Sequence, residues 1–350
     1  MLQTENKIID ENKTKKRLDY IDIAKGIGII LMIIGHAPLK NKYITNFIFS
    51  FHMPLFFLIS GYFFKPKEKK QCIKDIFKRL IIPYIITCIA IIAYKILKLV
   101  LNKDFMEIQS TFKIWTIASL YGSGTREDFN IQPIGAIWFL LALGFATYFM
   151  NCIYSKKYRY ILVFIIAYIG YKTTEFVWLP LSIQAGMTSL IFVYLGVIAK
   201  ENDILNKSIS KELYIALIFI VGFCTKYSGI LYMVGNVYQN GLLDVIGALA
   251  GSFLVIKASY LIQNNLKFLK TCIQFIGKNS LLFLCVHLFS LNCLQWTILN
   301  NKLLNIGIKN EELRVVFINI LSSILVVLTI DTIKKMKYCF ILKLKRKEDK

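Results

Sequence analysis

Lys25 and His36 are the two residues of the first long apolar run whose side chains could take part in chemistry. The run extends from Ile23 to Ala37, where a lysine or an imidazole is costly to bury in a membrane. The two residues are 11 positions apart, which at about 100° per residue puts them on nearly the same helix face, about 16 Å apart along its axis. Histidine titrates closest to neutral pH and therefore suits proton transfer. The spacing predicts a catalytic histidine at position 36 with a positive charge about three turns away.

The other two histidines, His52 and His287, also lie in apolar runs. Because a short loop joins the first two runs, we expect His52 to lie close to His36 at the outer ends of two neighbouring helices. Ser60, later in the same run, is followed by Gly61, and such a small pair lets another helix approach closely. An intramembrane histidine often has only a structural hydrogen-bonding role, so this alternative stays open for all three.

A strongly basic segment, residues 65–79, separates the second and third apolar runs. Such a loop is commonly a topology signal. Arg79 and its neighbours could instead hold a phosphorylated donor, because a guanidinium pairs with phosphate through two parallel hydrogen bonds.

Three further polar or amphipathic residues stand at the beginnings of later apolar runs. Trp138 is most simply an anchor at the membrane interface. Asn279 and Ser280 precede His287 and could cap the helix that carries it. Spacing alone assigns these residues no chemical role.

The elements that position these residues are expected to cross a membrane. The composition indicates this, because 56% of the 350 residues are hydrophobic and the mean hydropathy is +0.56. Apolar runs recur at about the length that spans a bilayer, and they are too long for barrel strands. The sequence therefore predicts an all-α, polytopic integral membrane bundle of about ten transmembrane helices. The predicted spans are residues 22–39, 44–64, 80–100, 134–154, 158–172, 180–199, 212–228, 242–262, 276–296 and 313–333.

The distribution of positive charge predicts the topology of these spans. Most of the 43 Lys and Arg residues fall in alternate connecting segments, which places both termini in the cytoplasm. The net charge of +22 is thereby explained by topology and by contact with anionic membrane lipid, with no nucleic-acid partner. We expect a cytoplasmic segment (1–19), a membrane domain (20–333) and a basic cytoplasmic tail (334–350). The semi-apolar segment 105–122 could lie in the interface or re-enter the membrane.

The eight cysteines form no CxxC pair and show no metal-ligand spacing. No P-loop, GxGxxG or GxSxG motif is present. We therefore expect no metal site and no bound cofactor.

Five segments together carry a family resemblance. They are RLDYIDIAKGIGIILMIIGHA (17–37), FSFHMPLFFLISGYFF (49–64), KRLIIPY (78–84), AIWFLLAL (136–143) and IGKNSLLFLCVHLF (276–289). The chain resembles the integral-membrane acyltransferase 3 family, which includes O-acetyltransferases of bacterial surface sugars. The most specific motif of this family is a basic residue, ten intervening positions and a histidine, which here are Lys25 and His36.

The resemblance implies a multi-pass enzyme of the cell (plasma or inner) membrane that transfers an acyl group. Cytoplasmic acyl-CoA, usually acetyl-CoA, would be the donor substrate, and a hydroxyl of a cell-surface glycan or lipid-linked sugar would be the acceptor. His36 would act as the general base or as a transient acyl carrier. Lys25 would steer the thioester arm of the donor or pair with a carboxylate, for which Asp22 is the candidate.

One departure from the family pattern concerns the donor site. Many relatives carry two arginines three residues apart at the start of the third span, whereas Ile82 follows Arg79 here. Lys78 supplies a charge beside Arg79 but not a planar, bidentate donor.

Two alternatives to an acyltransferase remain. The first is a polysaccharide transporter or exporter component without acyl-transfer activity, although the chain lacks the internal symmetry typical of transporters. The second is a non-catalytic membrane subunit or sensor whose three histidines are structural.

Overall fold

Helices make up almost all of the regular structure in the computed structural model, which describes residues 18–125, 131–294 and 296–348. The side chains of residues 297, 298 and 333–348 are not part of this description. An isolated antiparallel bridge joins Tyr232 and Val237. The all-α prediction is therefore confirmed. Within the described residues, the first half of the chain has the α-helices α2 (Asp19–Gly35), α3 (Lys42–Tyr62), α4 (Lys69–Ile76), α5 (Ile82–Asn102), α6 (Ile108–Tyr121), α7 (Trp138–Ile153) and α8 (Arg159–Thr173).

The second half of the chain continues the bundle. Its α-helices are α9 (Ile183–Glu201), α10 (Lys211–Phe223), α11 (Leu242–Asn265), α12 (Lys267–Lys278), α13 (Ser280–Cys293), α14 (Thr297–Asn305) and α15 (Glu311–Glu348). Short connecting turns are π-helical at Phe77–Ile81 and Cys224–Ser228, and 3-10 helical at Phe105–Glu107, Gly135–Ile137, Pro180–Ser182 and Met233–Gly235.

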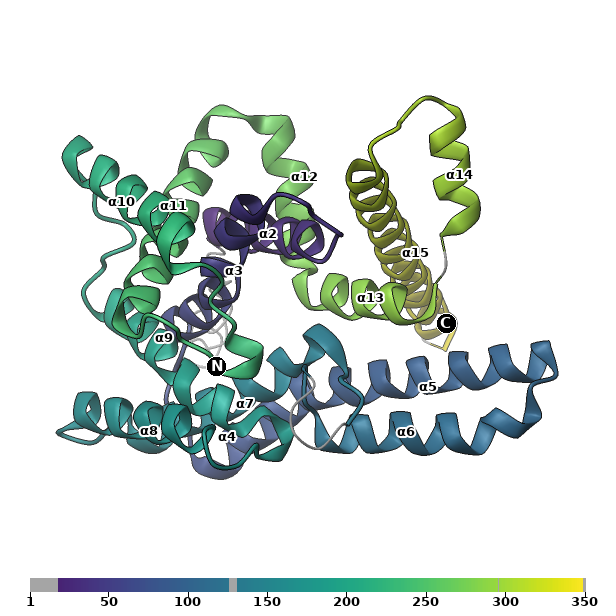
Figure 1. The fold of residues 1–350 in the computed structure, drawn as a ribbon, viewed down its shortest axis with the longest axis horizontal. Coiled ribbons are helices and arrows are strands. Elements are labelled where there is room, and N and C mark those ends of the chain that lie inside the picture. The colour runs from purple at the N-terminus through teal and green to yellow at the C-terminus, as the bar shows by residue number, and fades with distance from the viewer. Residues whose placement is uncertain (1–17, 126–130, 295, 349–350) are drawn as a thin grey trace.

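The helices α2 and α3 lie at the centre of the bundle (Figure 1). In that view α10 and α11 lie to their left, α13, α14 and α15 lie to their right, and the antiparallel pair α5 and α6 extends along the lower edge. Helix α3 packs on α9 and α11, and α2 packs on α12, α11 and α3. This arrangement surrounds the Lys25–His36 helix with other helices and so brings residues from distant parts of the sequence to it.

Six helices are long and apolar enough to cross a membrane, within the ranges that the structure describes. A seventh span results if the bent pair α12–α13 counts as one. Helices α2, α8 and α10 coincide with predicted spans but have only 17, 15 and 13 residues, which is short for a bilayer core of about 30 Å. The chain is thus a multi-pass membrane protein with six to seven candidate spans. The count of about ten and the orientation of the termini stay predictions.

The predicted span 276–296 contains all of α13 and only the last three residues of α12. The chain bends by 74° between α12 and α13, and Asn279 stands at the bend. Asn279 occupies the N-cap position of α13, but its side chain makes no capping hydrogen bond to that helix. Its Nδ2 donates instead to Phe275 O of α12 (3.0 Å). The bend turns α13 toward the carboxyl-terminal end of α2.

Close helix crossings hold this centre together, and glycine permits two of them. A Cβ on Gly277 of α12 would lie 1.6 Å from the backbone oxygen of Asp22 in α2, and one on Gly61 of α3 would lie 1.9 Å from that of Val193 in α9. The second contact agrees with the small-pair prediction for Ser60 and Gly61. Backbones therefore touch directly at both crossings, which fixes the position of α2 and α3.

The two terminal segments of the predicted organisation have different outcomes. The amino-terminal segment 1–19 lies outside the described residues except for Leu18 and Asp19. The backbone of α15 continues through the predicted tail to Glu348. The segment 105–122 forms the short turn Phe105–Glu107 and α6, which packs along α5.

Candidate active site

His36 is the first residue beyond α2, and its side chain is fixed by its own helix. Pro38 follows two positions later and cannot continue the helix. The imidazole Nδ1 lies 2.7 Å from the carbonyl oxygen of Met32. Because a carbonyl can only accept a hydrogen bond, Nδ1 carries the proton of the neutral ring and Nε2 retains its lone pair. His36 is therefore held in the tautomer that a general base requires.

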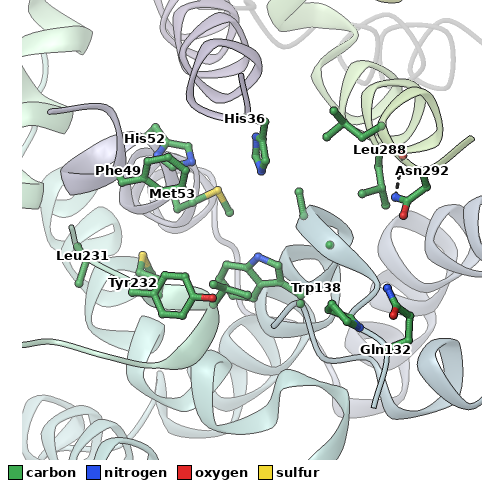
Figure 2. Close-up of a pocket in the computed structure, with 17 residues that line it drawn as sticks. His36, Phe49, His52, Met53, Gln132, Trp138, Leu231, Tyr232, Leu288 and Asn292 are labelled. Atoms are coloured by element: carbon green, nitrogen blue, oxygen red, sulfur yellow. Dashed lines mark hydrogen bonds between the residues drawn. The ribbon is translucent and has the colours of Figure 1, made fainter. Parts of the chain in front are cut away.

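This imidazole points into a cavity of about 440 Å³, here named the histidine cavity (Figure 2). It is lined by His36, just beyond α2, by residues of α3, α7 and α13, and by two connecting loops. The lining residues are His36, Phe49, His52, Met53, Gly124, Gln132, Pro133, Gly135, Ala136, Trp138, Leu231, Tyr232, Met233, Val234, Leu288, Leu291 and Asn292.

His52 lies in the same cavity, as its sequence position predicts. Its Nδ1 is 2.8 Å from the carbonyl oxygen of Ile48, so its tautomer is fixed in the same way as that of His36. The ring of Phe49 contacts both histidines edge to face, with centroid distances of 6.2 Å to His36 and 5.0 Å to His52.

His287 lies beside His36 but does not line the cavity. Their ring centroids are 5.5 Å apart. The side chain of His287 is fully buried, and within the described part of the chain neither of its ring nitrogens has a hydrogen-bond partner. The bend before α13 thus brings a second imidazole against the first.

A second cavity, of about 270 Å³, lies next to the histidine cavity and is here named the lysine cavity. Lys25, Ser60 and Ser280 line it together with mainly apolar residues, and Met53 lines both cavities. Lys25 Nζ lies 2.9 Å from Asp22 Oδ1, and the carboxylate is almost completely buried. The geometry thus pairs the two residues that were expected to pair.

A third cavity, of about 460 Å³, adjoins the second and is here named the basic cavity. Arg79, Lys65 and Lys67 line it, and Lys67 forms an ion pair with Asp75 at its edge. Arg79 belongs to the π-helical turn Phe77–Ile81. Four residues, Ser60, Phe63, Leu80 and Leu143, line both this cavity and the lysine cavity. The three cavities therefore form a series.

Two connecting loops close the side of the histidine cavity opposite α2. The hydroxyl groups of Thr125 and Tyr232 are 2.6 Å apart, which joins the loop after α6 to the loop before α11. In the first loop, Ser123 Oγ accepts a hydrogen bond from the indole N–H of Trp178 (3.1 Å). The cavity wall is thus held by hydrogen bonds between loops far apart in the sequence.

The structure brings together most of the predicted site residues. His36, His52 and Trp138 share the histidine cavity, Lys25, Ser60 and Ser280 share the lysine cavity, and Arg79 lines the basic cavity.

Three predicted placements need correction. Lys78 is exposed and lines none of the three cavities, although its neighbour Arg79 lines the basic cavity. Asn279 also lines none of them, since its side chain is turned back onto α12. Trp138 is only 4% exposed and faces inward, so it is not a membrane-interface anchor.

Several cavity residues were not anticipated from the sequence. Gln132 and Tyr232 lie in loops without apolar periodicity, and Met53 lies in an apolar helix where its type does not stand out. Asn292 is a polar residue in an apolar helix, and its type is a signal that could have found it. Lys65 and Lys67 belong to the basic segment 65–79, whose charge predicts a phosphate-binding role for the segment as a whole.

Comparison with known proteins places this site in a recognised domain. A family model described as an acyltransferase domain matches residues 18–331, which include every residue that lines the three cavities. Neither the curated proteins nor the solved structures gave a match.

Proposed function

Because the chain belongs to the acyltransferase 3 family and is a membrane acyltransferase, we propose that it transfers an acyl group, most simply acetyl, from acyl-CoA to a glycan. The donor is cytoplasmic acyl-CoA, and the acceptor is a hydroxyl of a cell-surface glycan or lipid-linked sugar. The plasma (inner) membrane is the corresponding location.

The series of three cavities is the observation that carries this proposal. It runs beside α2 from the guanidinium of Arg79, past Lys25, to the imidazole of His36. The phosphates of CoA suit the basic cavity, because arginine and lysine bind phosphate oxygens. The flexible pantetheine arm suits the mainly apolar lysine cavity, and its thioester would then reach His36.

His36 is positioned for general-base catalysis at the far end of the series. Its Nε2 takes the proton of the acceptor hydroxyl while the hydroxyl oxygen attacks the thioester carbon. The same proton is then available for the departing thiolate of CoA, which leaves as the thiol. Positioning of both substrates against one imidazole supplies the remaining rate enhancement.

A comparison of Arg79→Ala with Lys78→Ala tests the donor site. We expect Arg79→Ala to raise the KM for acetyl-CoA by about 10- to 100-fold, since a hydrogen bond to a charged group contributes about 1.5–3 kcal/mol. Lys78→Ala is the matched control and leaves the KM within about twofold, because Lys78 lines none of the cavities. Equal effects of the two substitutions would contradict this donor site.

A second pair of variants separates the catalytic role of Lys25 from its structural role. Lys25→Met removes the cation beside the buried carboxylate of Asp22, and breaking a buried pair in this way costs about 3–5 kcal/mol of stability. Adding Asp22→Asn should restore thermal stability while transfer stays about tenfold or more below wild type, because the fixed charge near the donor arm is still missing. The measurements are thermal unfolding in detergent and acetyl-CoA turnover. Recovery of transfer in the double variant would leave Lys25 with a structural role alone.

The decisive test of the function is the ester content of surface glycans. Cells that lack the gene would be compared with cells that express the wild-type chain, after mild alkaline release and identification of the acid. Ester that depends on the protein supports the proposal, and the released acid identifies the acyl group. Glycan that is lost from the surface, but carries unaltered ester when present, would instead favour an exporter component.

A further inference from the structure

Among the residues that the structure describes, none accepts a hydrogen bond from the indole N–H of Trp138, which lines the histidine cavity. Buried tryptophan N–H groups usually find an acceptor, and Trp178 and Trp296 do so through Ser123 and Ser290. Trp138 is 4% exposed and lines the cavity, yet its Nε1 makes no hydrogen bond to any residue that the structure describes. The N–H is therefore open to the cavity, where it is able to donate to a bound acceptor.

The direction of this donor is visible in Figure 2. His36 points into the cavity from one side, and the nitrogen edge of the Trp138 indole faces it from the other, with Met53 beside the space between them. A group bound between the two residues would have the Nε2 lone pair of His36 on one side and the N–H of Trp138 on the other.

The indole is also held rigidly. Trp138 begins α7 directly after the 3-10 turn Gly135–Ile137. A Cβ on Gly124 would lie 2.4 Å from Cδ1 of Trp138, so the backbone of Gly124 packs directly on the ring. The ring of Phe139 meets it edge to face, at a centroid distance of 6.5 Å. A donor fixed before the reaction needs no reorganisation when charge develops in front of it.

We infer that Trp138 is a catalytic residue, whose Nε1–H donates a hydrogen bond to the carbonyl oxygen of the acyl group. This inference rests on the proposed function. As the acceptor oxygen bonds to the carbonyl carbon, the π electron pair of the carbonyl moves onto its oxygen, and Trp138 stabilises that oxyanion. The pair then re-forms the carbonyl, the C–S bond breaks, and the thiolate takes the proton from His36. The products are the ester and CoA thiol.

Trp138→Phe tests this role, because it removes the N–H and keeps an aromatic ring. The assay is CoA release from acetyl-CoA by the full chain in lipid nanodiscs, where water replaces the unidentified acceptor. We expect kcat to fall by about 10²–10³-fold, the effect of losing one oxyanion donor, with the KM for acetyl-CoA within about twofold. Trp115→Phe is the matched control, since Trp115 lies on α6 under Lys95, outside the three cavities, and it should behave as wild type.

A second substitution covers the possibility that phenylalanine disturbs the fold. Benzothienylalanine at position 138 keeps the two-ring shape and has sulfur in place of the N–H group. It should reproduce the loss of kcat with an unchanged size-exclusion profile.

The other outcomes distinguish failure of this inference from failure of the proposed function. Wild-type kcat in the benzothienylalanine variant, or a raised KM alone, overturns the role of Trp138 while leaving an active acyltransferase. Absence of CoA release from the wild-type chain, with no protein-dependent glycan ester in cells, would overturn both.

Discussion

His36→Asn is expected to reduce acyl transfer by about 10²–10⁴-fold, the usual contribution of a general base. Asparagine offers an amide N–H that is able to donate to the Met32 carbonyl, as Nδ1 of His36 does at 2.7 Å. It has no counterpart of the Nε2 lone pair. The substitution therefore removes the base and preserves the local hydrogen bond. Both CoA release in nanodiscs and glycan ester in cells would report the loss.

The KM for acetyl-CoA provides the internal control for this variant. Because His36 lies at the opposite end of the cavity series from Arg79, the KM should stay within about twofold of wild type. Retention of a tenth or more of wild-type kcat, in a variant with normal membrane insertion, would be inconsistent with His36 as the base. Stable radiolabel on the protein after incubation with acetyl-labelled donor would instead indicate an acyl-histidine intermediate.

Gly277→Ala is expected to have the largest effect on stability. The added Cβ would lie 1.6 Å from the backbone oxygen of Asp22, and a backbone clash cannot be relieved by changing a rotamer. Overpacking of a core commonly costs about 1–3 kcal/mol and sometimes more, and here the displaced helix carries both Lys25 and His36. We expect a marked loss of monodisperse protein in detergent, together with a lower unfolding temperature.

Gly222→Ala is the matched control for this substitution. Gly222 is also helical, in α10, but a Cβ there would meet no atom within 4 Å. Alanine is a better helix former than glycine by about 0.5–1 kcal/mol, so the unfolding temperature should stay the same or rise slightly. A stable Gly277→Ala protein with full activity would show that α2 and α12 are able to separate without cost.

Much of the helical framework could be predicted from apolar periodicity. The predicted spans 44–64, 180–199 and 242–262 lie within a few residues of α3, α9 and α11, because each is a long apolar run bounded by polar residues. The same-face relation of Lys25 and His36 stays a prediction from ideal helix geometry. Helix α2 carries Lys25 and ends at Gly35, one residue before His36.

The bend before α13 and its consequence could not be predicted in the same way. The apolar run begins at Leu281, after the polar residues Lys278, Asn279 and Ser280. Hydropathy alone does not reveal the angle by which the helix axis turns there. The candidate capping residues Asn279 and Ser280 did mark the true start of α13. The 5.5 Å contact between His287 and His36 depends on that turn, so it required the tertiary structure.

The chemistry of the histidine cavity was similarly hidden from sequence. Tyr232 and Gln132 reach it from loops, where no periodicity specifies which side chains point inward. The sequence predicts Trp138 to lie at the membrane interface, because tryptophan at the end of an apolar run is commonly found there. Only the packing of α7 against the connecting loops reveals that its indole faces His36.

The mainly apolar lysine cavity separates the basic cavity from the histidine cavity, and this affects which part of the donor has to enter the membrane. If CoA stays at the basic cavity, as proposed, its charged phosphates need not enter the bilayer, where isolated charges are very costly. An uncharged acyl fragment alone passes to the other substrate. The process is then a group translocation, in which breaking the thioester bond supplies the driving force and neither an ion gradient nor a nucleotide is consumed at the membrane.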